Sequence, residues 1–225
     1  MASVIALLVM LLSLTAHAQN GQRISILGDS YSTFQGFIPE GNAVWYNVPN
    51  DAKRTDVKNV RQTWWWQVVN NGGFLLERND SYSGATICYT GYGDEDYSDR
   101  SFITRLPRLG SPDILLILGN TNDSWCGAQV GEYKYENIRR ADLYYYRPAL
   151  ARLLSEAQER YPNVRIYFIQ NTELRTDIVE STKVICGHYG VPLIQLKNIE
   201  KQAGHPNVKG MKAIAEQVLS VISQQ

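Results

Sequence analysis

The chain has 225 residues, of which 44% are hydrophobic and 20% charged, and its 22 basic and 22 acidic side chains give a formal net charge of zero. A disordered protein would contain fewer apolar residues, and a protein that binds nucleic acid electrostatically would carry an excess of basic ones. The composition excludes both classes, and the length suits one domain with a substantial buried core.

The amino-terminal segment has the pattern of a secretory signal peptide. Residues 4–14 are almost entirely apolar, and the small-x-small cleavage site that follows them ends at Ala18. The apolar run is shorter than the roughly 20 residues that a membrane-spanning helix needs. The pattern therefore predicts a signal peptide over residues 1–18, a mature domain over residues 19–225, and a secreted or periplasmic protein.

Short β-rich runs alternate with helical patterns along the rest of the chain. Strands that are separated by helices pair in parallel through right-handed crossovers. We therefore expect an α/β fold, a three-layer α/β/α sandwich around a five-stranded parallel sheet. In chain order the expected elements are strand 23–27, helix 60–70, strands 74–77 and 113–118, helix 141–160, strand 164–169, helix 176–189, strand 191–196 and helix 207–222.

Two long segments of the chain have no regular pattern. They span residues 34–58 and 90–99. Long loops in a compact domain are often functional. We therefore expect these two segments to form the rim of a substrate site.

Ser30 stands where ligands bind in this kind of sheet. Ligands lie beyond the carboxyl ends of the strands, where the strand order reverses. The first expected strand ends at Gly28 and is followed by Asp29, Ser30, Tyr31 and Ser32. Ser30 is therefore a candidate nucleophile. The alternative is that these short polar side chains cap a helix that follows.

A serine nucleophile needs a base to accept its proton. Of the three histidines, one leaves with the signal peptide, and His188 ends an expected helix whose dipole would stabilise it. His205 lies in the loop that enters the last helix, at the same edge of the sheet as Ser30. It is therefore the candidate base, and the alternative is an ordinary surface loop residue.

Acyl transfer also needs donors for the developing oxyanion. Asn122 lies in the loop after the third expected strand, and Gly84 lies in the loop after the second. The Asn122 amide can donate a hydrogen bond, and a glycine lets a backbone N–H come close to a substrate. Each residue alone could be explained by turn chemistry. Four loops at one edge, carrying Ser, Gly, Asn and His in that order, favour an acyl-transfer site.

These blocks resemble the SGNH (GDSL-type) hydrolase family, over residues 28–32, 82–86, 119–123 and 204–206. The resemblance implies a flavodoxin-like sheet and a serine esterase without metal or cofactor. It also implies that Ser30 is the nucleophile and His205 the base. The oxyanion hole would then be formed by the backbone N–H groups of Ser30 and Gly84 and by the side-chain amide of Asn122.

The chain departs from the family pattern at two positions. Asn120 replaces a glycine in the asparagine block, and asparagine tolerates a left-handed backbone better than most residues. Gln202 replaces the aspartate that normally precedes the histidine by three positions, so the usual acid is missing. Glu200 is the nearest carboxylate and is the candidate third member. The alternatives are a backbone carbonyl or the Gln202 oxygen that orients His205, or a weak Ser-His dyad.

The three cysteines give no metal-binding spacing. Their odd number excludes complete internal pairing. Cys88 and Cys126 each follow a candidate active-site loop and could be neighbours. The alternative that we favour is that both, with Cys186, are buried thiols that act as small hydrophobic residues.

The expected reaction is two-step hydrolysis of a short-chain acyl ester, most simply acetyl, on a small molecule or a carbohydrate. Asp29 and Trp125 are the candidate substrate-contacting residues, and Trp45 and Tyr46 are loop aromatics that could stack on sugar rings or belong to the core. Activity should fall in acid as His205 protonates, with a midpoint near neutrality. We expect no nucleic-acid partner, and no membrane partner after signal cleavage. The alternatives are an inactive carbohydrate-binding protein on this scaffold and a lipid or thioester hydrolase.

Overall fold

A five-stranded parallel sheet forms the middle layer of the structure, a computed structural model that describes residues 21–223. The expected signal peptide lies outside these residues. The strand order is β2-β1-β3-β4-β5, and every neighbouring pair is parallel. The strands are β1 (Arg23–Gly28), β2 (Leu75–Ser81), β3 (Ile114–Gly119), β4 (Arg165–Gln170) and β5 (Leu193–Gln195).

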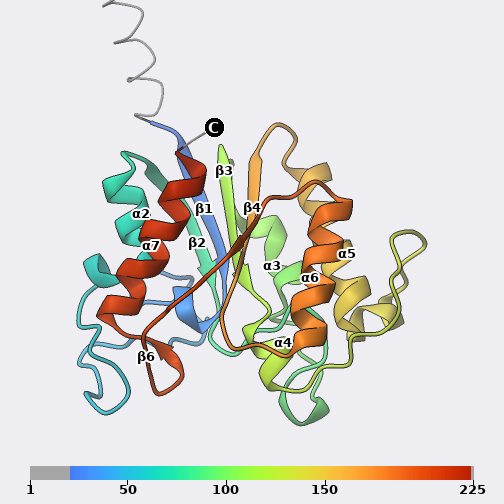
Figure 1. Ribbon diagram of the computed structural model, residues 1–225, viewed down its shortest axis with the longest axis horizontal. Coiled ribbons are helices and arrows are strands. Elements are labelled where there is room, and N and C mark those ends of the chain that lie inside the picture. The colour runs from blue at the N-terminus through green and yellow to red at the C-terminus, as the bar shows by residue number, and fades with distance from the viewer. Residues whose placement is uncertain (1–20, 224–225) are drawn as a thin grey trace, which may run out of the picture.

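Helices cover both faces of this sheet, which confirms the expected three-layer sandwich (Figure 1). On one face lie α2 (Trp64–Asn71) and α7 (Val208–Ile222), and on the other lie α3 (Phe102–Arg105), α5 (Tyr146–Arg160) and α6 (Thr176–His188). The remaining elements are α4 (Thr121–Trp125), the hairpin strands β6 (Lys201–Gln202) and β7 (His205–Pro206), and the 3-10 helices η1 (Ser30–Ser32), η2 (Val60–Gln62), η3 (Tyr92–Asp94), η4 (Leu106–Arg108) and η5 (Arg140–Tyr144).

The central strand β3 explains why its sequence is an uninterrupted apolar run. All six of its residues are buried, because helices pack on both faces of the sheet. Leu115 and Ile117 belong to the core beneath α3, α5 and α6. Ile114, Leu116 and Leu118 belong to the core beneath α2 and α7. Successive side chains of a strand point to opposite faces of the sheet, so β3 contributes to two separate hydrophobic cores.

Two expected helices begin later than the sequence predicts. The helix expected over 60–70 divides at Thr63, whose extended backbone caps α2 and whose hydroxyl accepts from the Trp66 N–H. The helix expected over 141–160 begins only at Tyr146, because Tyr145 is extended. In both cases a 3-10 turn precedes the α-helix, so the apolar pattern of the sequence continues across a residue that interrupts the helical conformation.

Strand β2 runs to Ser81, four residues beyond the expected end at Glu77. Its last residues are polar yet buried, and Arg105 explains why. The buried Arg105 guanidinium donates to the carbonyl oxygens of Gly28 and Asp80 and lies 3.7 Å from the Asp80 carboxylate. Burial lowers the pKa of Arg105 to about 10. This side chain joins the carboxyl ends of β1 and β2, where the candidate site begins.

The three cysteines are free thiols, with Cys88 and Cys186 buried and Cys126 half-buried. Burial raises the pKa of Cys126 to about 11 and that of Cys186 to about 12. The Cys88 and Cys126 sulfurs lie 3.5 Å and 3.9 Å from the same carbonyl oxygen, that of Thr90, so these two residues are neighbours. Among the helices of residues 21–223, none has both the length and the apolar character required to span a membrane.

The two-sided core predicts very different costs for two leucine truncations. Leu116→Ala opens a cavity in the fully buried centre of β3 and should reduce the free energy of unfolding by about 2–5 kcal/mol. Leu75→Ala, on the edge strand and 56% exposed, should change it by less than about 0.5 kcal/mol. Urea unfolding followed by circular dichroism measures both. Similar losses in the two variants would contradict the described core.

Candidate active site

The end of β1 and the β6–β7 hairpin bring a serine hydroxyl and an imidazole together. Ser30 Oγ and His205 Nε2 are 2.9 Å apart, although 175 positions separate the residues in sequence. Ser30 is the first residue of η1, which follows β1 directly, and the Asp29 carboxylate caps η1 by accepting from the Tyr31 N–H at 3.0 Å. The β6–β7 hairpin and α4 lie at the same end of the sheet (Figure 1).

A backbone carbonyl holds the other ring nitrogen of the histidine. His205 Nδ1 is 3.1 Å from the Ala203 oxygen, which fixes the proton on Nδ1 and leaves Nε2 free to accept from Ser30. Ala203 and Gly204 form the two-residue loop between β6 and β7, and both have positive φ, +47° and +76°. This is the backbone that tight hairpin loops require. It is strained for an alanine, and such strain is often found at functional sites.

Glu200 does not contact the imidazole, so its expected place beside His205 is wrong. Its carboxylate accepts from the Asn207 side-chain amide and lies 3.6 Å from Lys209 Nζ, at the start of α7. Gln202 does not orient the ring either, because the group at His205 Nδ1 is the Ala203 carbonyl, and the Gln202 side-chain amide donates to the Ala52 carbonyl at 2.8 Å. Of the alternatives considered for the missing acid, the backbone carbonyl is the group that the structure places at Nδ1.

Asn122 is buried with both ends of its amide held. Its Nδ2 donates to the Ala85 carbonyl at 2.9 Å, and its Oδ1 accepts from the Tyr92 hydroxyl at 2.8 Å. An amide nitrogen carries two hydrogens, so one remains for another acceptor. The turn that brings Asn122 here uses Asn120 in the left-handed region, at φ +69°, where the family pattern has glycine.

Gly84 lies in the turn in which the Ala85 N–H donates to the Tyr82 carbonyl at 3.2 Å. Its φ is +87°, a conformation that favours glycine. A Cβ built at this position would meet no atom within 4 Å, so glycine is required by the backbone angle and not by packing. The N–H of the third residue of such a turn takes no part in the turn's hydrogen bond.

The Asp123 carboxylate joins the loop of Gly84 to the helix of Asn122. It is buried and accepts from the backbone N–H groups of Ile87 and Cys88, each at 3.0 Å. Burial raises the pKa of Asp123 despite these hydrogen bonds. Asp123 therefore fixes the two loops that carry the candidate oxyanion donors relative to one another.

Aromatic rings surround the imidazole. Trp45 stacks on it with ring centroids 3.5 Å apart and planes at 11°, while Tyr31 and Trp125 approach at 5.3 Å and 5.7 Å. Trp125 is 42% exposed and can meet a ligand at this site. Tyr46 is fully buried and donates to a backbone carbonyl of the histidine loop, so it belongs to the core.

Burial makes His205 a weaker base than an exposed histidine. Its pKa is lowered to about 4, mainly because burial disfavours the charged ring, and the positive charges of Arg54 and Lys201 add to the effect. The imidazole therefore stays neutral through the physiological range. This pKa lies below the midpoint near neutrality expected from the sequence, because the sequence does not show how deeply the ring is enclosed.

Asp29 is fully buried, so it does not reach a substrate as expected from the sequence. One of its carboxylate oxygens caps η1, which is the alternative considered for the polar residues after β1. Burial raises the pKa of Asp29 to about 7. The role that the structure gives to Asp29 is to shape the turn that presents Ser30.

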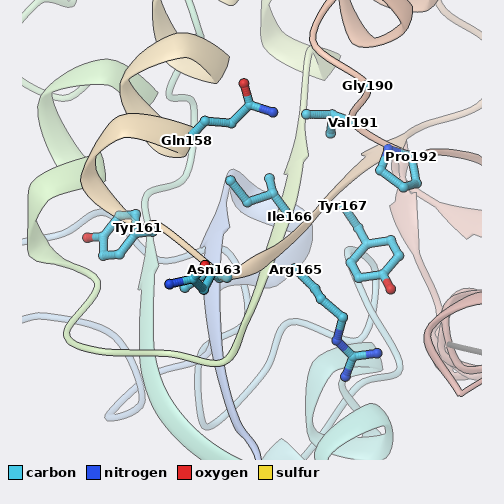
Figure 2. A pocket seen from close by; sticks show the side chains of 10 residues that line it. Gln158, Tyr161, Asn163, Arg165, Ile166, Tyr167, Gly190, Val191 and Pro192 are labelled. Carbon is cyan, nitrogen blue, oxygen red and sulfur yellow. The ribbon is translucent and has the colours of Figure 1, made fainter.

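Figure 2 shows a separate pocket, which is lined by residues near the beginnings of two strands. Its volume is about 360 Å³, and Arg165, Val191 and Pro192 line it from the beginnings of β4 and β5. Ser30 follows the end of β1, and β1 and β4 run in the same direction in the sheet. The pocket is therefore a strand's length from the Ser30–His205 pair. Among residues 21–223, no group of three or more His, Cys, Asp or Glu is placed to hold a metal ion.

Tyr92, Asp123, Arg54 and Trp45 lie at the site in places that the sequence does not reveal. Tyr92 holds Asn122, Asp123 joins two loops, and Arg54 covers Trp45 on the face away from His205, with its guanidinium carbon 4.1 Å from the ring centroid. Tyr92, Trp45 and Arg54 come from the two long irregular segments. Their length pointed to the rim of a site, but no spacing pattern indicates which of their side chains turn inward.

A sequence model of the GDSL-like lipase/acylhydrolase family matches residues 22–222, and the protein belongs to this family. Proteins assigned as GDSL-like lipases from Bacteroides ovatus and Bacteroides uniformis have crystal structures that superpose with TM-scores of 0.89 and 0.90. Each is 50% identical in sequence to this chain. The first covers 92% of this chain and 100% of its own, and the second covers 93% and 99%.

A more distant structure shares the fold alone. It is a family two carbohydrate esterase from Clostridium thermocellum in complex with cellohexaose, 14% identical, with a TM-score of 0.62 over 90% of this chain and 64% of its own. A comparison with curated protein sequences gives no match. The family confirms the resemblance carried by the four sequence blocks and places the protein among hydrolases that act on esters.

The enclosure of His205 predicts its titration. The imidazole should protonate with a midpoint near pH 4, because its neutral form is favoured down to that pH. NMR of the ring protons against pH measures this directly, with His205→Asn identifying the signal. A midpoint near the ordinary histidine value of about 6.5 would contradict the buried geometry.

Proposed function

We propose that the protein is a serine esterase that cleaves short acyl esters through an acyl-enzyme intermediate. The observation that carries the proposal is the 2.9 Å contact between Ser30 Oγ and His205 Nε2. It is the arrangement of a hydroxyl nucleophile with its base. The membership of an esterase family supports the same reaction.

The first step uses the free lone pair on His205 Nε2. Nε2 accepts the Ser30 proton as Oγ attacks the ester carbonyl, and the imidazolium then protonates the departing alcohol. In the second step, the same nitrogen takes a proton from water, and the hydroxide that forms cleaves the acyl-Ser30 bond. His205 returns the proton to Ser30, so the enzyme ends unchanged.

The negative charge on the tetrahedral intermediate needs donors that are already in place. We assign this role to the backbone N–H groups of Ser30 and Gly84 and to Asn122 Nδ2. The Asn122 amide is supported by its fixed orientation, since the Tyr92 hydroxyl occupies Oδ1 and leaves Nδ2 as the end that can face the oxyanion. A single side-chain donor of this kind is worth about 10²–10³-fold in kcat.

The Ala203 carbonyl takes the place of the usual acid, and its chemistry is weaker. It accepts from Nδ1 and so keeps the productive tautomer. A carbonyl is neutral, however, and cannot compensate the imidazolium charge as a carboxylate does. In a serine protease, neutralising the acid lowers turnover by about 10⁴-fold. The proposal is therefore a Ser-His dyad with a backbone carbonyl as the third group.

The substrate that we propose is a short acyl ester, with acetylated carbohydrate as the first class. Ser30 and Asn122 are only 2% and 3% exposed, which favours a small acyl group. Trp125 is 42% exposed beside His205 and offers an aromatic surface to a sugar on the alcohol side of the ester. The related fold in complex with cellohexaose supports the same class. Export, through the signal-peptide pattern, would place the enzyme where glycans are met.

Removing the nucleophile tests the reaction. Ser30→Ala should abolish hydrolysis of p-nitrophenyl acetate, because no other group is positioned beside His205 Nε2 in the described part of the chain. Ser111→Ala, an exposed serine at the opposite end of the sheet, is the control and should keep wild-type kinetics. If wild-type protein fails to hydrolyse the ester, or if Ser30→Ala retains the activity, the esterase proposal is overturned.

The enclosed serine also predicts chain-length selectivity. The kcat/KM for p-nitrophenyl acetate should exceed that for the octanoate ester by at least about tenfold, which is a difference of about 1.4 kcal/mol in the transition state. Steady-state kinetics on the two esters provides the comparison. A preference for octanoate would favour the lipid-hydrolase alternative.

The place of Glu200 predicts a variant with nearly unchanged kinetics. Glu200→Gln keeps an acceptor for the Asn207 amide and should retain kcat within about twofold, because the carboxylate does not contact His205. His205→Asn, made in parallel, should lose nearly all activity. A large loss of kcat in Glu200→Gln would show that its charge takes part in catalysis.

A further inference from the structure

One flat face of the candidate base is covered by an indole. The ring centroids of Trp45 and His205 are 3.5 Å apart, and the rings are nearly parallel at 11°. Arg54 covers the opposite face of Trp45, with its guanidinium carbon 4.1 Å from the ring centroid. The three side chains therefore form a layered stack of arginine, tryptophan and histidine. Trp45 contacts two protein groups at its ring, so its structural contacts compete with any stacking on a sugar.

Two hydrogen bonds alone do not fix the orientation of the imidazole. The imidazole can rotate about its Cβ–Cγ bond, and such a rotation weakens the contacts of Nδ1 with Ala203 O and of Nε2 with Ser30 Oγ. Neither partner carries a charge that would resist the rotation. A parallel ring packed on one face removes this freedom. In a Ser-His-Asp site, the charge of the acid strengthens the hydrogen bond at Nδ1, and that charge is absent here.

The segment that carries this stack is tied to the histidine loop at several points. We name residues 45–56 the clamp segment. Tyr46 Oη donates to the Pro206 carbonyl at 2.9 Å, and Asp56 Oδ1 accepts from the Val208 N–H at 2.8 Å. Gln202, at the position where the family has its acid, donates to the Ala52 carbonyl at 2.8 Å. The side chain that replaces the acid thus holds the segment that covers His205.

The indole N–H of Trp45 is buried and has no hydrogen-bond partner among residues 21–223. A buried donor without a partner costs free energy. The contact that the ring itself makes is direct stacking on His205, with ring centroids 3.5 Å apart. This observation favours a role for the ring surface of Trp45 over a role for its polar atom.

We infer that Trp45 is a positioning residue that fixes the orientation of the His205 ring. In a Ser-His-Asp site the charge of the acid helps to orient the histidine, and here the packing of the clamp segment does so. The inference rests on the proposed function, because it assumes that His205 acts as the base. The π face of Trp45 also attracts a cation, so it stabilises the imidazolium that forms when His205 takes the serine proton. The positive charge of Arg54 disfavours the imidazolium. The role that we give to Arg54 is therefore to pack against Trp45 and hold it in place.

Kinetics of Trp45 variants give the first test. Trp45→Leu keeps an apolar side chain without a flat ring and should lower kcat for p-nitrophenyl acetate by up to about 10²-fold, with little change in KM, because the base is misaligned. Trp45→Phe restores a ring and should recover most of kcat. Trp66→Leu, a half-buried tryptophan of the α2 core, is the matched control and should retain kcat.

The second test observes the stack without any turnover. In the Ser30→Ala background, the His205 ring protons should show an upfield ring-current shift that Trp45→Leu removes and Trp66→Leu preserves. Arg54 and Lys201 are the charged groups facing the imidazole, and Tyr31 is its titratable aromatic neighbour. Arg54→Gln removes one positive charge, so the midpoint of the His205 titration should rise, and kcat should fall severalfold as the backing of Trp45 is lost.

The outcomes separate the two proposals. If Ser30→Ala abolishes activity but Trp45→Leu keeps kcat within twofold of wild type, the positioning role is overturned and the esterase stands. If Trp45→Phe fails to restore kcat while its unfolding midpoint matches wild type, the flat ring is not the operative feature. If the upfield shift is present and no ester is hydrolysed, the stack exists and the proposed function fails. Should Trp45→Leu not fold, an unchanged His205 midpoint and kcat in Arg54→Gln would overturn the inference.

Discussion

The site depends on one contact between the two ends of the domain, the hydrogen bond between Ser30 and His205. Neither residue is placed by its local sequence alone. Strand β1 places Ser30 at the carboxyl end of the sheet, and the tight turn at Ala203 and Gly204 places the imidazole there. Because β1 lies next to the middle strand of the sheet and α7 packs on the core beneath it, the contact between the two groups depends on that core.

Buried polar contacts hold the strand ends and loops of the site in fixed relative positions. Arg105 ties the ends of β1 and β2, and Asp123 ties the loop of Gly84 to the helix of Asn122. Such groups are costly to bury, and each is stabilised by hydrogen bonds that a mispositioned loop would break. The donors that we propose for the oxyanion are therefore held by the fold before a substrate arrives, which is the condition for electrostatic stabilisation of a transition state. The base is held differently, by a carbonyl and by stacked rings.

Much of this could be predicted from the sequence. The buried run of β3 and the alternation of strands with helices predict the layers, and two of the polar blocks contain Ser30 and His205, which lie within hydrogen-bond distance of each other. The orientation of His205 could not be predicted, because it depends on a left-handed Ala203 that has no sequence signature. Glu200 contacts Asn207 and not His205, because nearness in sequence does not fix the direction in which a loop side chain points. The contacts of Trp45 come from a long loop whose path only tertiary packing decides.

The central claim is that His205 activates Ser30. Mass spectrometry after treatment with a fluorophosphonate tests it most directly, because the reagent bonds only to a serine whose hydroxyl is activated. The account predicts a single adduct on the Ser30 peptide in wild-type protein and its loss in His205→Asn. An unlabelled wild-type protein, or labelling that persists at Ser30 without the imidazole, would contradict it.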